Sequence, residues 1–93
     1  MIIGLLTVEA IIYDAHSLKE KRAVLQRITT RLKQKYNISV SEVDFQDTWQ
    51  RTKIAIAAVA SIKVSVEKEL QHVLKFIDSF PEMERTLTDI EWL

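Results

Sequence analysis

Residues 2–13 alternate between an apolar face and a mixed face. The even positions are all apolar or small, whereas the odd positions are mostly aliphatic but include Thr7 and Glu9. A strand with one wholly apolar face and a second, half-apolar face is typical of the centre of a sheet. We therefore expect this segment to form a central strand.

The next segment changes to a helical period. Ser17 followed by Glu20 is a capping box, in which each side chain satisfies a backbone N–H near the other residue. The apolar positions that follow share one helical face: Leu18, Val24, Leu25, Ile28, Leu32 and Tyr36. Asn37 tolerates the left-handed conformation that closes many helices, so we expect the helix to end there.

Two short alternating segments follow, Ile38–Ser41 and Glu42–Phe45, and they are out of phase with each other. One extra residue in a strand exchanges its faces, so the phase change predicts a β-bulge near Ser41 and Glu42. Residues 46–51 then break the pattern as a hairpin connection. Residues 53–61 predict a third strand, although their alanines also leave a helix open as an alternative.

The helical period returns from Ser65 and ends before Pro81. Its apolar face consists of Val66, Leu70, Val73, Leu74 and Ile77. Glu67 and Glu69 are expected in the first turn, where the helix dipole favours acids. Residues 85–93 alternate again and carry enough charge for a strand at a sheet edge.

The order β-α-β-β-α-β over 93 residues predicts a single α+β domain, residues 1–93, with the ferredoxin-like plan. Right-handed crossovers place both helices on one face of a four-stranded antiparallel sheet, giving a two-layer sandwich. The first and third strands then lie in the middle, which agrees with their apolar character.

Charge is distributed unevenly along this neutral chain. Residues 16–36 carry seven bases and one acid, a local charge of +6, and the rest of the chain carries −6. Such asymmetry favours a surface that binds a polyanion such as RNA. The candidate residues are Lys19, Lys21, Arg22, Arg27, Arg31, Trp49 and Arg51. The competing interpretation is a solvated helix face that attracts acidic strands and loops of its own fold.

Trp49 lies in the predicted hairpin connection beside Gln50 and Arg51. An indole ring in a loop can stack on a base or anchor a partner. The structural alternative is that Trp49 covers the open end of the core while Asp47 pairs with Arg51.

The sheet face away from the helices is predicted to be partly apolar. It would carry Ile3, Leu5, Ile11, Tyr13, Ala55, Ala57 and Val59. Exposed apolar patches are commonly partner surfaces. The central strands lack the aromatic platforms with which RNA-recognition modules of this fold stack bases. This face therefore favours a homodimer, or a further segment that covers it.

The sequence contains no recognisable catalytic or metal-binding motif. There is no cysteine, the two histidines lie on different elements without further ligands, and a single glycine cannot form a phosphate-binding loop. We predict no enzymatic activity, no metal and no cofactor. No signal-peptide pattern or membrane-length apolar run is present, so we expect a cytoplasmic protein that does not span a membrane.

Three stretches resemble the YlxP-like family of small bacterial proteins, a domain of unknown function: residues 16–22, 37–44 and 47–51. They occur in order and span nearly the whole chain. The resemblance implies a ferredoxin-like fold. It also implies an association with translation, because genes of this family often lie between those of a translation initiation factor and a ribosome-binding factor. It supplies no catalytic residue.

These observations predict a small binding protein that contacts ribosomal RNA or a ribosome-associated protein through the basic helix and the Trp49 loop. The alternative function is a protein–protein adaptor that dimerises through its open sheet face and has no role with nucleic acid.

Overall fold

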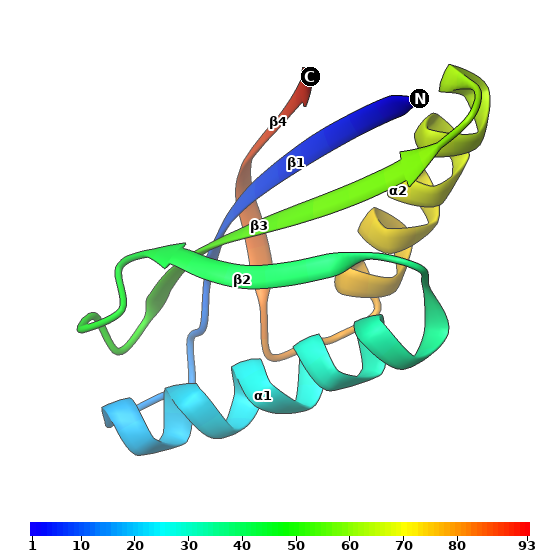
Figure 1. Ribbon diagram of the computed structural model, residues 1–93. Coiled ribbons are helices and arrows are strands. Elements are labelled where there is room, and N and C mark those ends of the chain that lie inside the picture. Colours follow the sequence, from blue (N-terminus) through cyan, green and yellow to red (C-terminus); the bar gives the residue numbers. More distant parts are fainter.

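The computed structural model describes all residues from 1 to 93 and contains six regular elements (Figure 1). In chain order they are β1 (Ile2–Ile11), α1 (Leu18–Lys35), β2 (Ser39–Asp44), β3 (Arg51–Ala60), α2 (Lys63–Asp78) and β4 (Glu84–Trp92). The strands form one antiparallel sheet in the order β2-β3-β1-β4. This is the predicted ferredoxin-like α+β plan, with β1 and β3 central and β4 at an edge.

The core lies between the sheet and the helices. Alternate residues of the central strands, from Leu6 to Ala10 and from Ile54 to Ala58, are buried against the helices. They meet the apolar stripes of both helices: Leu25, Ile28, Leu32, Val66, Leu70, Val73 and Ile77. Because these residues repeat at period two in strands and about 3.6 in helices, the binary pattern alone specifies this core.

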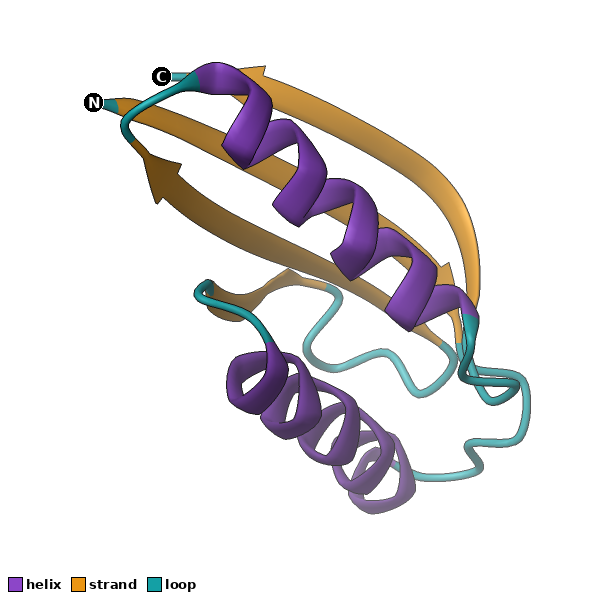
Figure 2. Ribbon diagram, turned by 90° about the vertical axis from the view of Figure 1, so that its right-hand side faces the viewer, coloured by secondary structure: helices purple, strands orange, loops and turns teal.

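The two helices cover different parts of the sheet (Figure 2). α2 packs across β1 and β3, whereas α1 lies beside β2 and the neighbouring side of α2. α2 also reaches β4 through side chains at its two ends, where Lys63 lies over the Trp92 ring and Asp78 pairs with Arg85. Gly4 allows α2 to approach β1, since a Cβ at this position would lie 2.7 Å from Val66 Cγ1 and 3.2 Å from the Trp92 ring. The C-terminal end of β4 lies far from α1, whereas the start of β4 lies near it (Figure 1).

Several predicted boundaries were wrong by a few residues. The pairing of β2 with β3 shifts register between Glu42 and Asp44. The bulge predicted near Ser41 and Glu42 therefore lies slightly later in the strand. α1 ends at the C-cap Tyr36, which has an extended conformation. Asn37 does not adopt the predicted left-handed conformation, and the residue with a positive φ is Phe45, at 61°. α2 begins at Lys63, so its first turn contains no acid.

Candidate nucleic-acid interface

α1 begins at the capping box that its sequence predicts. The N-cap Ser17 Oγ accepts a hydrogen bond from the Glu20 backbone N–H at 3.1 Å. The Glu20 carboxylate accepts from the His16 backbone N–H at 2.6 Å, one residue earlier than the reciprocal bond of the standard motif. These bonds satisfy two free N–H groups and fix the start of the basic helix.

Lys21 is fully buried, although it lies in the most basic segment of the chain. Its ammonium lies 3.1 Å from Glu42 Oε2 in β2 and donates a hydrogen bond to the Phe45 carbonyl. The buried hydroxyl of Thr52 donates to the same Glu42 oxygen at 2.5 Å. Lys21 therefore joins α1 to the β2–β3 hairpin, and the prediction that it contacts a phosphate is wrong.

One side of α1 uses its bases to hold the fold together. Arg27 forms an ion pair with Glu82 in the α2–β4 connection. The Arg31 guanidinium lies 5.8 Å from the Phe80 ring centroid, and the Lys35 ammonium lies 4.7 Å from that of Phe76. These contacts lie along one helical stripe at intervals of four residues. They support the competing interpretation, in which part of the basic charge is structural.

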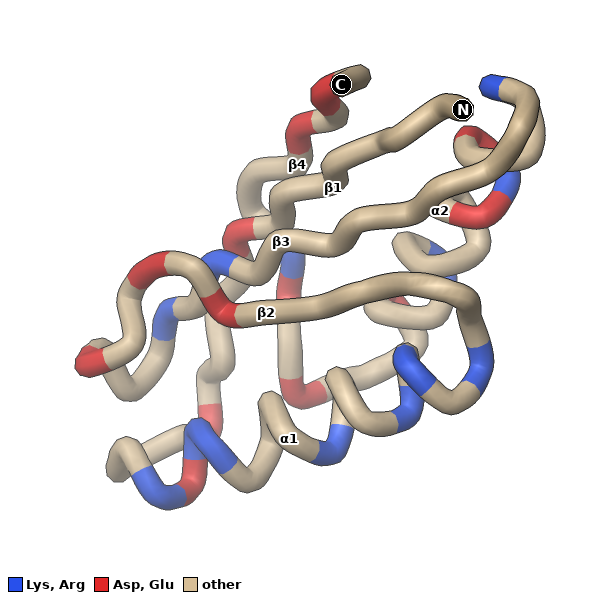
Figure 3. The backbone as a smooth tube through the Cα atoms, in the orientation of Figure 1, with Lys and Arg blue, Asp and Glu red and all other residues tan.

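The other side of α1 carries Lys19, Arg22 and Lys33, all of them exposed. None of the three has a carboxylate within ion-pair distance or lies over an aromatic ring. At about 100° per residue they share one face of the helix, and at 1.5 Å per residue they span about 21 Å. We call this set the free basic face (part of the basic series visible along α1 in Figure 3).

The Trp49 loop is held at the same end of the molecule as the start of α1 (Figures 1 and 2). The Gln50 side-chain amide donates to the carbonyls of Tyr13 at 3.0 Å and Ala15 at 3.3 Å, which precede α1. Trp49 itself is 52% exposed. It therefore does not close the end of the core, and its ring is available to a partner.

Arg51 belongs to a different surface from the free basic face. It lies 3.1 Å from Glu9 across the open sheet face and 4.2 Å from the ring centroid of Phe45. The alternative pairing with Asp47 does not form. Of the seven predicted polyanion residues, only Lys19, Arg22 and Trp49 are both exposed and without a partner inside the fold. Lys33 completes the face, and its helical spacing from Arg22 was the signal available in the sequence.

The open sheet face is less uniformly apolar than predicted. Ile3, Leu5, Ala55 and Ala57 are half-buried, and Val59 is 52% exposed. The Glu9–Arg51 ion pair crosses the face between this patch and its predicted members Ile11 and Tyr13. The Tyr13 hydroxyl donates to Glu84, and this hydrogen bond raises the pKa of Tyr13. The predicted dimer face is thus divided into an apolar patch and a polar margin.

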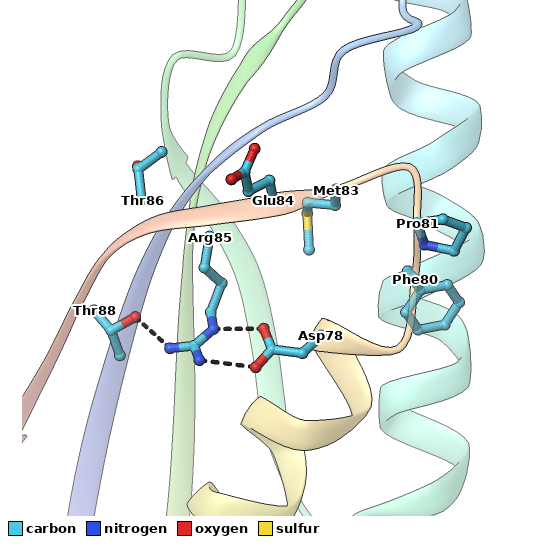
Figure 4. A pocket seen from close by; sticks show the side chains of 8 residues that line it. All are labelled: Asp78, Phe80, Pro81, Met83, Glu84, Arg85, Thr86 and Thr88. Atoms are coloured by element: carbon cyan, nitrogen blue, oxygen red, sulfur yellow. Dashed lines mark hydrogen bonds and ion pairs between the residues drawn. The ribbon is translucent and has the colours of Figure 1, made fainter.

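A cleft of about 480 Å³ lies between the end of α2 and the start of β4 (Figure 4). Arg85 donates to Asp78 through Nε at 2.6 Å and Nη2 at 2.8 Å, and to Thr88 through Nη1 at 2.8 Å. The hydrogen bonds from Arg85 hold the pKa of Asp78 below its usual range, and Asp78 raises that of Arg85. Because the guanidinium is occupied on both edges, this cluster clamps β4 to α2.

No three histidine, aspartate or glutamate side chains come together as metal ligands. Neither helix has the length and apolarity needed to cross a bilayer.

Comparisons with known proteins agree with the sequence resemblance. The family model described as "Protein of unknown function (DUF503)" matches residues 3–90. "Uncharacterized protein YlxP" of Bacillus subtilis (strain 168) is 66% identical over 90 residues, which cover 97% of this chain and 98% of that protein. A solved structure, "De novo designed protein Foldit4", matches with a TM-score of 0.56 and 12% sequence identity. The match covers 100% of this chain and 97% of the designed protein, and at this identity it supports the fold alone. The chain belongs to the DUF503 family of proteins of unknown function, and the predicted YlxP-like resemblance is confirmed.

Proposed function

We propose that this chain is a small cytoplasmic RNA-binding protein without catalytic activity, and that RNA lies along the free basic face of α1. The observation that carries this proposal is the absence of any internal partner for Lys19, Arg22 and Lys33. Three exposed cations that form no internal ion pair make a positive surface, and a row of phosphates bound there releases its own counterions.

Trp49 gives the proposed interface a second kind of contact. Its exposed indole stacks on an unpaired base, an interaction that accepts any base because each has a π-face. The bonds from Gln50 to the connection before α1 support this role, because a loop that is already ordered loses less entropy on binding. The interface therefore favours single-stranded RNA and contacts mainly its backbone.

Ribosomal RNA, or a ribosome-associated protein beside it, is the partner we propose first. The support is the association of the YlxP-like family with translation genes, which names the assembly but no activity. The contacts described above would suit any single-stranded RNA, so the choice of ribosomal RNA depends on co-sedimentation of the protein with ribosomal subunits.

Fluorescence anisotropy with a single-stranded RNA of about 20 nucleotides tests the proposal. Three phosphate contacts predict that affinity falls about 20-fold between 50 and 200 mM salt. Charge reversal of the free basic face, Lys19→Glu with Arg22→Glu and Lys33→Glu, should abolish this salt dependence and weaken binding by more than about tenfold. Trp49→Ala should weaken binding to the single strand and leave binding to a duplex of the same sequence nearly unchanged.

The matched control reverses three exposed lysines of the other helix, Lys63, Lys68 and Lys75. It changes the net charge by the same amount and should retain most of the affinity. Equal losses in the two triple variants would show that only net charge matters, and absence of binding at 50 mM salt would refute the proposal.

A homodimeric adaptor remains the second candidate, because Ile3, Leu5 and exposed Val59 form an apolar patch on the open sheet face. Light scattering tests it directly. A dimer that Val59→Lys converts to a monomer would support this function, and a monomer at high concentration would exclude it.

A further inference from the structure

The two edges of the sheet differ in how they are protected. β2 is only six residues long, ends in a bulge, and has α1 packed beside it. β4 is nine residues long and contains neither proline nor lysine, and its one irregularity lies near its start, where Thr86 is the extra residue opposite Glu9 and Ala10. Short strands, bulges, lysine and proline are the usual means of blocking an edge. Charged side chains are a further means, and in the stretch Leu87–Trp92 the acids Asp89 and Glu91 are the only protection of these kinds.

The backbone groups that this edge presents follow from its pairing with β1. Leu93 N–H donates to the Ile3 carbonyl at 3.0 Å, so these two residues form a hydrogen-bonded pair. Hydrogen-bonded and non-bonded pairs alternate along antiparallel strands. Thr88, Ile90 and Trp92 therefore direct their N–H and C=O groups away from β1, toward the free edge.

Side chains of opposite character flank these groups. On the helix side, Ile90 is 42% and Trp92 37% exposed. On the open face, Asp89 and Glu91 lie opposite Thr7 and Leu5 and have no cation within ion-pair distance. Figure 3 shows acidic positions on β4 near the C-terminus, away from α1.

We propose that the β4 edge binds an extended segment of a basic partner protein, which adds a fifth strand to the sheet. The backbone of the segment pairs with Thr88, Ile90 and Trp92. Its aliphatic side chains cover the exposed parts of Ile90 and Trp92, and the alternate side chains are lysine or arginine and meet Asp89 and Glu91. Cross-strand neighbours lie about 4.5–5.5 Å apart, within reach of both kinds of contact.

Charge argues against a second copy of this chain as the occupant. β4 carries Glu84, Asp89 and Glu91 against one base, Arg85, and that base is already bound by Asp78. Pairing β4 with its own copy would join two strands of net charge −2, and like charges across strands are destabilising. A basic strand reverses the sign of this interaction. The surface lies apart from the free basic face, so the proposal stands independently of RNA binding.

A labelled octapeptide of alternating lysine and valine is the probe, with an octapeptide of alternating glutamate and valine as its matched control. At 50 mM salt we expect the lysine peptide to bind at least about tenfold more tightly by fluorescence anisotropy, a difference that a few exposed charge pairs can supply. Asp89→Lys with Glu91→Lys should remove this preference. Asp14→Lys with Asp47→Lys makes the same charge change at exposed loop positions and should preserve it.

Ile90→Pro tests the backbone contact, because proline removes an outward N–H while the neighbouring residues keep their bonds to β1. It should weaken peptide binding at least about tenfold. If circular dichroism shows that this variant is unfolded, the double charge variant alone decides. Equal or absent binding of the two peptides would overturn the proposal, as would a homodimer that dissociates on Ile90→Pro while the protein stays folded.

Discussion

The two sides of α1 carry similar bases in different surroundings. Arg27, Arg31 and Lys35 lie against Glu82 and the rings of Phe80 and Phe76, so their charge is used within the fold. Lys19, Arg22 and Lys33 face solvent with no internal partner. A helix with a local charge of +6 thus offers a partner only about half of its cations. The local charge of a segment indicates a binding surface only when the charged side chains already paired inside the fold are left out of the count.

The largest expected effect concerns Lys21, which belongs to neither side. Lys21→Ala leaves Glu42 and the Phe45 carbonyl without their buried partner, and removing one member of a buried pair costs about 3–5 kcal/mol. Urea denaturation followed by circular dichroism measures the free energy of unfolding. Lys19→Ala is the control and should change it by less than about 0.5 kcal/mol. Equal effects would mean that Lys21 is not buried in solution.

Two triple variants test whether the two sides of α1 have different roles. Alanine at Arg27, Arg31 and Lys35 should lower the free energy of unfolding by about 1–2 kcal/mol, because it removes one exposed ion pair and three cation–π contacts. The same change at Lys19, Arg22 and Lys33 should leave stability almost unchanged and weaken RNA binding instead. Denaturation and anisotropy on both proteins give the two readouts. If both triples had the same profile, the two sides of α1 would not be functionally distinct.

The smallest expected effect concerns Arg85, a base outside α1 that is also used within the fold. Its hydrogen bonds lower the pKa of Asp78, so the pair stabilises the fold above the ordinary aspartate pKa of about 3.9, and this stabilisation is lost as pH falls through the folded-state value. Asp78 is 47% exposed, so less than about 1 kcal/mol is involved. Asp78→Asn should reduce the decline in unfolding free energy between about pH 4 and pH 2. An unchanged pH profile would show that the clamp is not formed in solution.

The fold was predictable because the spacing of apolar residues along the chain indicates which side chains are buried. The apolar faces of β1, α1 and α2 follow from residue spacing. The strand order follows from the β-α-β-β-α-β plan with right-handed crossovers, and the apolar character of β1 and β3 agrees with it. The site was only partly predictable. Lys33 could have been found by its spacing from Arg22, but the burial of Lys21 depends on Glu42 and Phe45, which lie more than twenty residues away in the chain. The ion pair between Arg51 and Glu9 likewise depends on strand register, which periodicity does not specify.

The pairing of Gly4 with Trp92 has a consequence for how the chain folds. β1 pairs with β3 on one side and with β4, residues 84–92, on the other. The two ends of the chain must therefore meet before the sheet is complete. Contacts of such long range close large loops and slow folding relative to helical proteins of the same size. Until β4 arrives, β1 exposes an unpaired edge richer in aliphatic residues than β4 itself. Aggregation during synthesis or refolding should therefore depend on how quickly residues 84–92 dock.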